Sequence, residues 1–281
     1  MKNKPLYQAI FGAKLYSAYR YIKDKKDVYA KPVATTLGFK LAGNEAMING
    51  SFEPFETEII KKIVPKIDIF INVGANIGYY CCLALSYGRK VIAFEPVNSN
   101  LQYLFRNIKA NNWQNEIEVF PVALSDKIGL IDIYGEGTGA SLVKGWANTP
   151  EDSATIVACT TLDSIIGDKY VGKQCLILVD IEGAEKFMLN GAAKLLIMHP
   201  KPIWIVEISI TEHLADESKV NSNLVETFNI FYENGYDVWT ADDECRSVVK
   251  DEISLIAETG INTIKTHNFI FAENTKSDLF K

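Results

Sequence analysis

The segment NVGANIG at residues 72–78 holds the first residues whose types and spacing suggest chemistry. It joins an apolar run at 67–73 to an amphipathic run at 77–87, which predicts a strand, a tight turn and a helix. Glycines in such a turn let a ligand approach the backbone closely, and the free N–H groups of a helix N-terminus bind carboxylate or phosphate groups. A dinucleotide fingerprint would place a glycine at position 76, where this chain has Asn76. This difference favours a ligand without a pyrophosphate at that point.

Acidic residues end two further apolar runs. Glu95, with Pro96 after it, ends one of them, and an acid there can accept hydrogen bonds from both hydroxyls of an adenosine ribose. Asp180 ends another run, and Glu182 follows two residues later. Because the carboxyl ends of parallel strands line the ligand crevice of a doubly wound sheet, we expect Asp180 to face the site. For Glu182 the alternative is that it stabilises the dipole of the next helix.

Glu207 lies at the end of a later apolar run, and His213 follows six residues further on. The carboxylates of Asp180 and Glu207, from neighbouring strand ends, would offer oxygen ligands to Mg²⁺. His213 is a candidate general base, because the unperturbed pKa of histidine lies near neutral pH. The alternative is a histidine with a structural role only.

The elements that must position these residues alternate along the chain. Apolar runs that predict strands alternate with amphipathic runs that predict helices, so we expect a parallel sheet with helices on both faces. The strands are almost wholly apolar, which is typical of strands covered on both faces. The predicted strands cover 67–73, 90–95, 116–122, 174–180 and 202–208, the predicted helices cover 77–87, 97–112, 184–197 and 220–234, and residues 236–240 and 267–272 predict a closing antiparallel pair.

Residues 128–160 interrupt this alternation. Two strand-like runs, 130–134 and 154–159, flank a loop that contains Gly and Ser, so we predict a β insertion. Such a loop can close over a substrate and exclude water. Ser141 and Trp146 are its candidate substrate contacts, Trp146 by stacking on a sugar ring, and the alternative is a mobile hairpin end without a ligand.

The composition and the net charge limit the classes of protein to which the chain can belong. The 281 residues are 48% hydrophobic and 23% charged, which is typical of a globular chain that buries one large core. The net charge of −6 argues against nucleic-acid binding. Residues 1–31 carry a net charge of +6, so we predict a basic helical arm and lead-in over 1–50, with a helix at 6–23, before a catalytic domain at 51–281. The arm would pack on the body, join sister subunits in a homo-oligomer or contact an anionic membrane surface.

The cysteines and the apolar stretches indicate in which cellular compartment the protein lies and whether it crosses a membrane. Five cysteines without any CxxC spacing argue against a zinc ribbon or a disulfide scaffold and favour the cytoplasm. No secretory signal is expected, because Lys14 breaks the first apolar stretch. Residues 69–88 carry no charge and are long enough to span a bilayer, but two asparagines and three glycines favour a strand, a turn and a buried helix. We therefore predict no transmembrane span.

Several motifs in order resemble those of FkbM-type methyltransferases. NVGANIGYY, AFEP, Asn107 and Asn112, ALSDKIG, TLD, DIEGAE and IVEI follow one another over roughly residues 50–240. The resemblance implies an α/β, Rossmann-like class I methyltransferase fold, with a mostly parallel, doubly wound sheet of seven strands and a terminal antiparallel pair. It also implies S-adenosylmethionine as the cofactor. The implied cofactor contacts are Asn72, Gly74, Ala75, Asn76 and Gly78 at the methionine end, Glu95 and Pro96 at the ribose, Ala123, Leu124 and Ser125 at the adenine, and Asp180.

The resemblance further implies O-methylation of a hydroxyl group. We expect a small-molecule or glycan substrate, first of all a sugar in bacterial surface polysaccharide or glycolipid biosynthesis, with a polyketide-type product as the alternative. The family usually has Asp at position 72 and Lys at position 179, where this chain has Asn72 and Val179. Unlike an aspartate, Asn72 cannot make a charge-assisted hydrogen bond to the cofactor. An alternative is therefore that the chain is a catalytically inert partner in a biosynthetic complex. A nicotinamide-dependent oxidoreductase is the remaining class.

A mechanism follows for the expected methyltransferase. The sulfonium methyl group is already activated, so orientation of the acceptor oxygen supplies most of the barrier reduction. A positioned base must also take the acceptor proton, and the candidates are Asp180, Glu182 and His213. Alternatively, Mg²⁺ on Asp180 and Glu207 would lower the pKa of the alcohol. Glu207 is in addition a candidate substrate contact.

Overall fold

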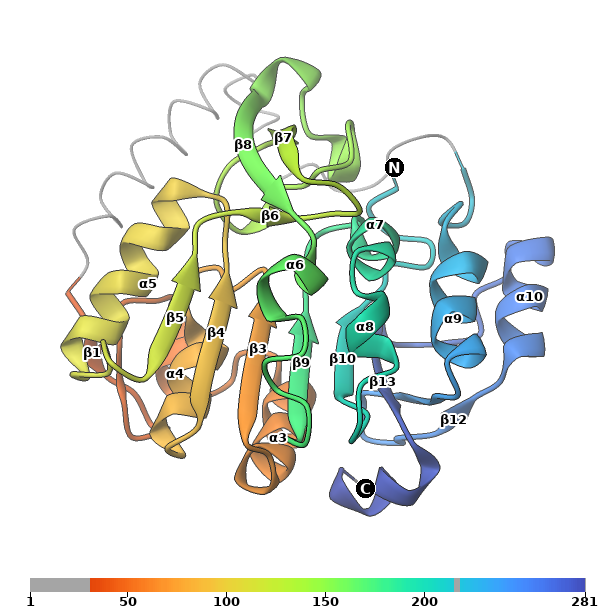
Figure 1. Cartoon of the computed structure of the whole chain (residues 1–281). Coiled ribbons are helices and arrows are strands. Elements are labelled where there is room, and N and C mark those ends of the chain that lie inside the picture. The colour runs from red at the N-terminus through yellow and green to blue at the C-terminus, as the bar shows by residue number, and fades with distance from the viewer. Residues whose placement is uncertain (1–30, 215–217, 281) are drawn as a thin grey trace.

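The computed structural model describes residues 31–214 and 218–280, which are arranged around one central sheet (Figure 1). The strand order is β12-β11-β13-β10-β9-β3-β4-β5. The parallel part consists of β3 (Ile69–Val73), β4 (Lys90–Phe94), β5 (Ile117–Phe120), β9 (Cys175–Val179) and β10 (Ile203–Glu207). The chain runs outward from β3 through β4 to β5, and then continues on the other side through β9 to β10. The order therefore reverses between β3 and β9, which is where ligands bind in such sheets.

The far side of the sheet carries antiparallel strands. β13 (Asn268–Ala272) runs antiparallel to both of its neighbours, β10 and β11 (Asp237–Thr240). The predicted closing pair and the predicted doubly wound, Rossmann-like sheet are thereby confirmed. The predicted number of seven strands is wrong by one, because the short strand β12 (Ser247–Val248) pairs with β11.

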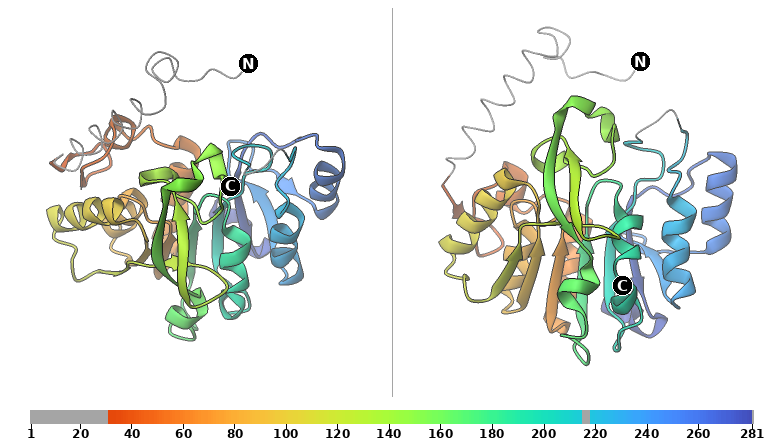
Figure 2. Two further views of the ribbon diagram at one scale, coloured as in Figure 1. Left: turned by 90° about the horizontal axis from the view of Figure 1, so that it is seen from above. Right: turned by 45° about the horizontal axis from the view of Figure 1, so that its top comes forward.

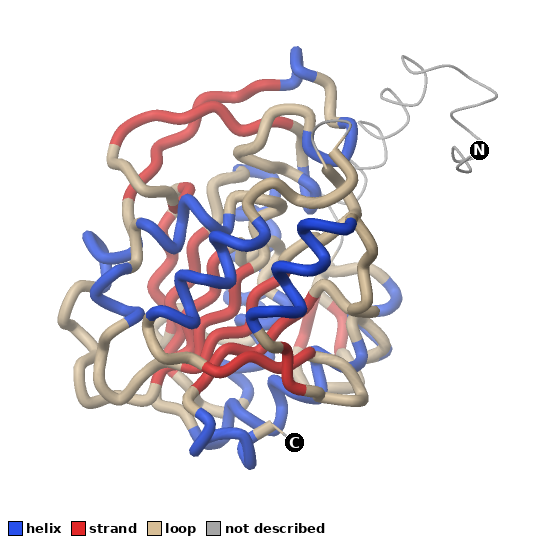
Figure 3. The backbone as a smooth tube through the Cα atoms, turned by 90° about the vertical axis from the view of Figure 1, so that its right-hand side faces the viewer, coloured by secondary structure: helices blue, strands red, loops and turns tan. Residues whose placement is uncertain are grey.

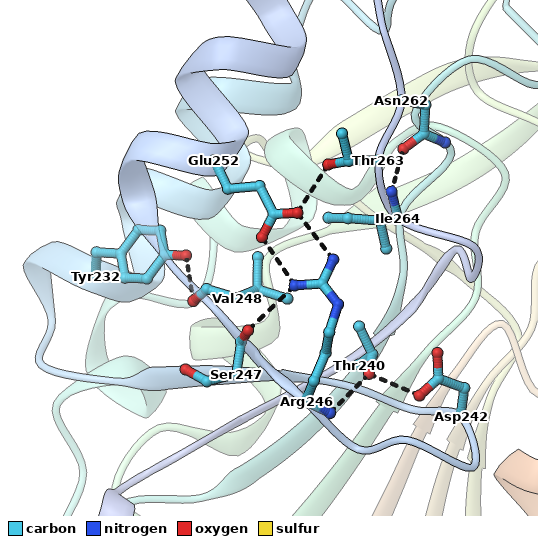
Figure 4. Close-up of polar contacts among 10 residues, drawn as sticks. All are labelled: Tyr232, Thr240, Asp242, Arg246, Ser247, Val248, Glu252, Asn262, Thr263 and Ile264. Atoms are coloured by element: carbon cyan, nitrogen blue, oxygen red, sulfur yellow. Dashed lines mark hydrogen bonds and ion pairs between the residues drawn. The ribbon is translucent and has the colours of Figure 1, made fainter.

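A side-chain cluster fixes this eighth strand (Figure 4). Arg246 donates to both carboxylate oxygens of Glu252, at 2.9 and 2.8 Å, and Thr263 donates to the same carboxylate at 2.8 Å. The hydrogen bond from Arg246 lowers the pKa of Glu252. The backbone N–H of Arg246 donates to Thr240 Oγ1. Polar side-chain contacts hold this strand of two residues, so the local apolar pattern did not predict it.

Helices cover both faces of the sheet. One face packs against α3 (Pro54–Ile63), α4 (Tyr79–Ser86) and α5 (Asn98–Ala110). The other face packs against α6 (Leu162–Ile166), α7 (Glu185–Asn190), α8 (Ala193–Leu196), α9 (Leu224–Glu233) and α10 (Lys250–Thr259). The strands β3 and β9 between these layers are buried at every residue, as their apolar sequences predict. The helix predicted over 184–197 is two helices that separate at Gly191, where the carbonyl of Ser125 would lie 2.2 Å from a Cβ atom.

The insertion forms a second sheet with the order β6-β8-β7. It consists of β6 (Ala123–Leu124), β7 (Gly129–Tyr134) and β8 (Ala154–Thr160), and short 3₁₀ turns occupy its loop. Figures 2 and 3 show β7 and β8 standing above the carboxyl ends of the central strands. The expected β strands of residues 128–160 are present, and they lie over the edge of the sheet where the sequence places the candidate site.

A short lead-in precedes the sheet, with β1 (Val33–Ala34), β2 (Lys40–Leu41) and α2 (Glu45–Asn49). Side chains of α5 attach it. Asn107 accepts a hydrogen bond from the N–H of Ala42 at 2.7 Å and donates to the carbonyls of Ala42 and Ile77, at 3.3 and 2.8 Å. Asn111, which immediately follows α5, makes the same pair of bonds with the backbone of Lys40. The two asparagines thus act as backbone partners for a segment outside the central sheet.

Two expectations concern the start of the chain and its relation to a membrane. The helix predicted at 6–23 and the basic arm lie outside the described residues. Across 31–214 and 218–280, no helix has the length and apolarity needed to cross a membrane.

Asn107 should contribute more to stability than Asn111, although the two make similar bonds. Asn107 is fully buried, whereas the bonds of Asn111 lie at the surface. We expect Asn107→Ala to lower the free energy of unfolding by about 2–4 kcal/mol, because buried backbone groups lose their partners. Asn111→Ala should cost about 1 kcal/mol or less. Urea unfolding of both variants measures the difference, and equal losses would contradict the assignment.

Candidate active site

Two cavities open at the carboxyl ends of the central strands. The first has a volume of about 560 Å³ and lies between the glycine turn, Glu95 and the insertion. The second has a volume of about 520 Å³ and lies between the same turn, α3 and the ends of β9 and β10. Gly74, Asn76 and Asp180 line both cavities. These three residues therefore mark the junction through which a ligand in one cavity would meet a ligand in the other.

The glycine turn brings β3 and β9 close together. A Cβ atom on Gly74 would lie 1.9 Å from the carbonyl oxygen of Asp180, and one on Gly78 would lie 2.3 Å from Leu104. Both glycines and Asn76 have positive φ angles, which glycine and asparagine adopt most readily. Gly74 lines the junction, whereas Gly78 packs on α5 and lines neither cavity.

Glu95 lies at the wall of the first cavity with 3% of its surface exposed. Its carboxylate accepts hydrogen bonds from the N–H of Asn76 at 2.7 Å, from the N–H of Val97 at 2.8 Å and from Asn100 Nδ2 at 3.2 Å. Burial raises the pKa of Glu95, and these three bonds oppose that shift. A carboxylate can accept about four hydrogen bonds, so one acceptor position remains for a ligand.

The other expected cofactor contacts are divided between the cavities and the protein interior. Pro96, Ala123 and Leu124 line the first cavity, and Ala75 lines the second. Ser125 is 2% exposed and lines neither cavity. Its N–H donates to the carbonyl of Thr160, which extends the pairing of β6 with β8.

The insertion is fastened to the loop after β9 through the two residues expected to contact substrate. Trp146 Nε1 donates to Glu182 Oε2 at 2.8 Å, and Ser141 Oγ donates to the carbonyl of Glu182 at 2.5 Å. Trp146 is 4% exposed, and a Cβ atom on Gly183 would lie 2.4 Å from its ring. The structure thus places Ser141 and Trp146 inside the protein, where the indole face is covered and cannot stack on a sugar.

His213 does not join the other candidate bases. Its side chain is exposed and lines neither cavity, and its backbone carbonyl accepts a hydrogen bond from the N–H of Ala147 at 3.0 Å. Glu182 lines the first cavity, but Trp146 already occupies one of its oxygens. Asp180 is the candidate base that lies at the junction itself.

The second cavity is acidic. Asp180, Glu207, Glu53 and Glu56 line it together. Burial raises the pKa values of Asp180, Glu207 and Glu53, and repulsion from neighbouring carboxylates raises them further. The two strand-end acids that the sequence placed side by side are therefore close enough to influence each other.

Asn72 also lines this cavity and is 2% exposed. Its Nδ2 contacts Cys81 Sγ at 3.5 Å, while its Oδ1 has no hydrogen-bond partner in the structure. A buried acceptor without a donor costs free energy. The cavity thus holds an acceptor that a bound molecule can satisfy.

At the expected Mg²⁺ site, two acidic side chains, Asp180 and Glu207, line the second cavity. Within the part of the chain that the structure describes, no group of three or more His, Cys, Asp or Glu residues could hold a metal ion. The Mg²⁺ site therefore stays a prediction.

Sequence reasoning missed several residues of the second cavity. Glu53 and Glu56 belong to the start of α3, far from any recognised motif. Asn268 lies opposite Glu207 in the pairing of β10 with β13. The predicted strand at 267–272 offered a signal for Asn268, because a closing antiparallel strand brings its first residues to the carboxyl edge of the sheet.

The bond between Trp146 and Glu182 should hold the insertion in place. We expect Trp146→Phe to remove this bond, to open the insertion more often and to raise the rate of limited proteolysis within residues 135–153 several-fold. Ile156→Ala is the matched control, since Ile156 belongs to the same insertion but is 67% exposed. An unchanged cleavage rate in the Trp146 variant would show that the bond does not hold the insertion.

Glu185 should make stability depend on pH. It is 3% exposed and accepts a hydrogen bond from the N–H of Gly183 at 2.8 Å. Burial raises its pKa from 4.5 to about 7, so the folded state holds the proton longer than the unfolded state. The resulting stabilisation is complete below pH 4.5 and is lost as the pH rises through about 7.

We expect this loss to reach up to about 3 kcal/mol. Urea unfolding at several pH values should show a smaller decline for Glu185→Gln, which keeps the acceptor oxygen, and an unchanged decline for Glu233→Gln on the exposed side of α9. A Glu185→Gln variant that declines as steeply as the unmodified protein would contradict the prediction.

Comparison with known proteins identifies the family of the chain. The sequence pattern of the methyltransferase FkbM domain matches residues 72–238. Comparison with curated proteins gives no match. Among solved structures, the chain is similar to a methyltransferase FkbM from Methylobacillus flagellatus KT, with 16% identity and a TM-score of 0.42 over 91% of this chain. The chain spans 60% of the length of that protein.

Two further structures are similar. One is an O-methyltransferase family protein from Burkholderia thailandensis, with 11% identity and a TM-score of 0.40, over 92% of this chain and 70% of that one. The other is the magnesium protoporphyrin IX methyltransferase of Synechocystis PCC 6803, solved with bound S-adenosylmethionine, with 8% identity and a TM-score of 0.41 over 89% of each chain. Because the FkbM domain pattern covers more than half of the chain and includes both the glycine turn and the strand-end acids, this protein belongs to the FkbM methyltransferase family.

Proposed function

We propose that the protein is an S-adenosylmethionine-dependent O-methyltransferase. One observation carries the proposal: a strand-end carboxylate, Glu95, lies in the same cavity wall as the glycine turn. This is the arrangement that binds the ribose of an adenosine ligand beside a close approach of the backbone.

The residues of the first cavity fit the adenosine part of such a cofactor. Ala123 and Leu124 would contact the adenine, and Glu95 with Pro96 would contact the ribose. Gly74 leaves open the space that a Cβ atom would fill at the junction, where the methionine end would begin. When bound, the cofactor supplies an electrophilic methyl group.

Asp180 is the base that we propose for the acceptor hydroxyl. It lines both cavities, so it can face a cofactor in the first and an acceptor in the second. Burial and its acidic neighbours raise its pKa, which makes the carboxylate a stronger base. Glu207 lines the second cavity with it and would hold the acceptor or share the proton. The acceptor oxygen is then oriented by the cavity walls and loses its proton as it attacks.

The family supports a hydroxyl-bearing small molecule or glycan as the acceptor. We propose a sugar of a bacterial surface polysaccharide or glycolipid, with a polyketide-type product as the second candidate. The cytoplasm is the proposed location, supported by five cysteines that are all free in the structure. The basic N-terminus would allow contact with a membrane surface or with a second subunit.

Calorimetric titration with S-adenosylhomocysteine tests the cofactor site. The unmodified protein should bind it, and both Glu95→Ala and Glu95→Gln should weaken binding roughly tenfold or more, because a hydrogen bond to a charged group is lost. Glu116→Ala is the control, since Glu116 is exposed and immediately precedes β5 at the opposite edge of the sheet. Absence of binding by the unmodified protein would contradict the proposal.

A further inference from the structure

Residues 136–140 of the insertion form a turn at the first cavity, which we call the roof turn. Gly137 and Ala140 line that cavity together with Glu95 and Asp180, which directly follow β4 and β9. The strands β7 and β8 that flank the roof turn stand above the carboxyl ends of the central strands (Figure 2). A molecule in the first cavity would therefore lie between these strand ends and the roof turn.

Asn100, in the first turn of α5, joins the roof turn to Glu95. It is 5% exposed and lines the first cavity. Its Nδ2 donates to Glu95 Oε1 at 3.2 Å and to the carbonyl oxygen of Gly137 at 3.1 Å. Because both partners are acceptors, the amide must direct its nitrogen toward them, and both of its N–H groups are used. One buried side chain thus contacts a strand-end acid and the insertion at the same time.

The same contact directs the carboxylate of Glu95. Its Oε1 accepts hydrogen bonds from Asn100 and from the N–H of Val97, whereas its Oε2 accepts one from the N–H of Asn76. A carboxylate oxygen accepts about two hydrogen bonds, so the free acceptor position lies on Oε2. Asn100 therefore helps to set which oxygen of Glu95 a ligand hydroxyl can reach.

The insertion is held at two ends that differ in strength. Beyond the roof turn, Ser141 and Trp146 are 1% and 4% exposed, and both donate hydrogen bonds to Glu182, Trp146 to its carboxylate. The side-chain bond from α5 to the roof turn joins two uncharged groups, and such bonds are weaker than bonds to a charged group. A Cβ atom on Gly137 or Gly139 would meet no atom within 4 Å. The roof turn is therefore the end that opens, while the end at Glu182 stays attached.

We propose that Asn100 is a positioning residue that latches the roof turn over the bound cofactor, and that release of this latch limits how fast the cofactor leaves. A ligand that contacts the roof turn binds the closed arrangement better than the open one and so shifts the chain toward it. Without the latch the closed arrangement is less populated, and the apparent affinity falls by the same fraction. This inference rests on the proposed function, because it places the cofactor in the first cavity.

Surface plasmon resonance with the full chain immobilised and S-adenosylhomocysteine in solution tests the latch, because it measures both rate constants. We expect Asn100→Ala to raise the dissociation rate about fivefold or more and to leave the association rate unchanged or higher. Asn100→Asp keeps the shape of the side chain but sets an acceptor against both partners, so it should raise the dissociation rate at least as much. Asn98→Ala is the matched control, since Asn98 is an exposed asparagine at the start of the same helix. It should keep both rates.

The variant Glu95→Gln separates the two bonds of Asn100. If Asn100 acted through Glu95 alone, Asn100→Ala would add nothing to the dissociation rate of the Glu95→Gln chain. We expect a further increase of about threefold or more, because the bond to Gly137 is lost in that chain as well.

Cleavage after Glu136 by a glutamate-specific protease gives a local measurement, since Glu136 is exposed in the roof turn. Saturating S-adenosylhomocysteine should slow this cleavage about fivefold or more in the unmodified protein. At equal saturation it should slow the cleavage less than about twofold in Asn100→Ala, because the occupied cavity no longer holds the turn closed.

Three results would overturn the inference: an unchanged dissociation rate in both Asn100 variants, an increase that disappears in the Glu95→Gln chain, or cleavage after Glu136 that the ligand does not slow. Each of them leaves the proposed cofactor site intact, because S-adenosylhomocysteine still binds. Failure of the unmodified protein to bind S-adenosylhomocysteine would instead overturn the proposed function, and the inference with it.

Discussion

The contact between the glycine turn and the end of β9 is the constraint on which the site depends. Gly74 approaches the carbonyl of Asp180 so closely that any side chain at position 74 would displace it. The N–H of Asp180 in turn donates to the carbonyl of Val73, so the two strands remain paired up to the point where they diverge. Both cavities, and the junction between them, are defined by this one approach. Glu95 then fixes the other side of the turn through the N–H of Asn76.

Much of the fold follows from local patterns, and the site follows only in part. The parallel strands could be predicted because buried strands are apolar throughout, and the acids at their ends could be placed because parallel strands end at one edge. The local pattern did not reveal β12, which the ion pair of Arg246 with Glu252 holds in place. It also did not reveal the break between α7 and α8 at Gly191, where the distant carbonyl of Ser125 leaves no room for a side chain.

The residue roles in the insertion show the same limit. Trp146 and Ser141 have the types expected of substrate contacts, and their loop lies over the site. Their partner, Glu182, belongs to a segment more than thirty residues away and adopts a positive φ angle. Only the three-dimensional structure shows that the polar groups of these side chains are used within the protein. Glu53 was missed for a related reason, because α3 reaches the site through packing and not through any sequence motif.

The bond between Trp146 and Glu182 also has an optical consequence. Of the four tryptophans in the chain, Trp204 and Trp239 lie in the core, and Trp113 packs beside Phe39. Trp146 is hydrogen-bonded to the carboxylate of Glu182, in the wall of the first cavity. The emission of an indole responds to a nearby negative charge and to water, so this side chain is a built-in fluorescent reporter. A chain in which the other three tryptophans are replaced would follow the position of the insertion in real time, without an attached dye.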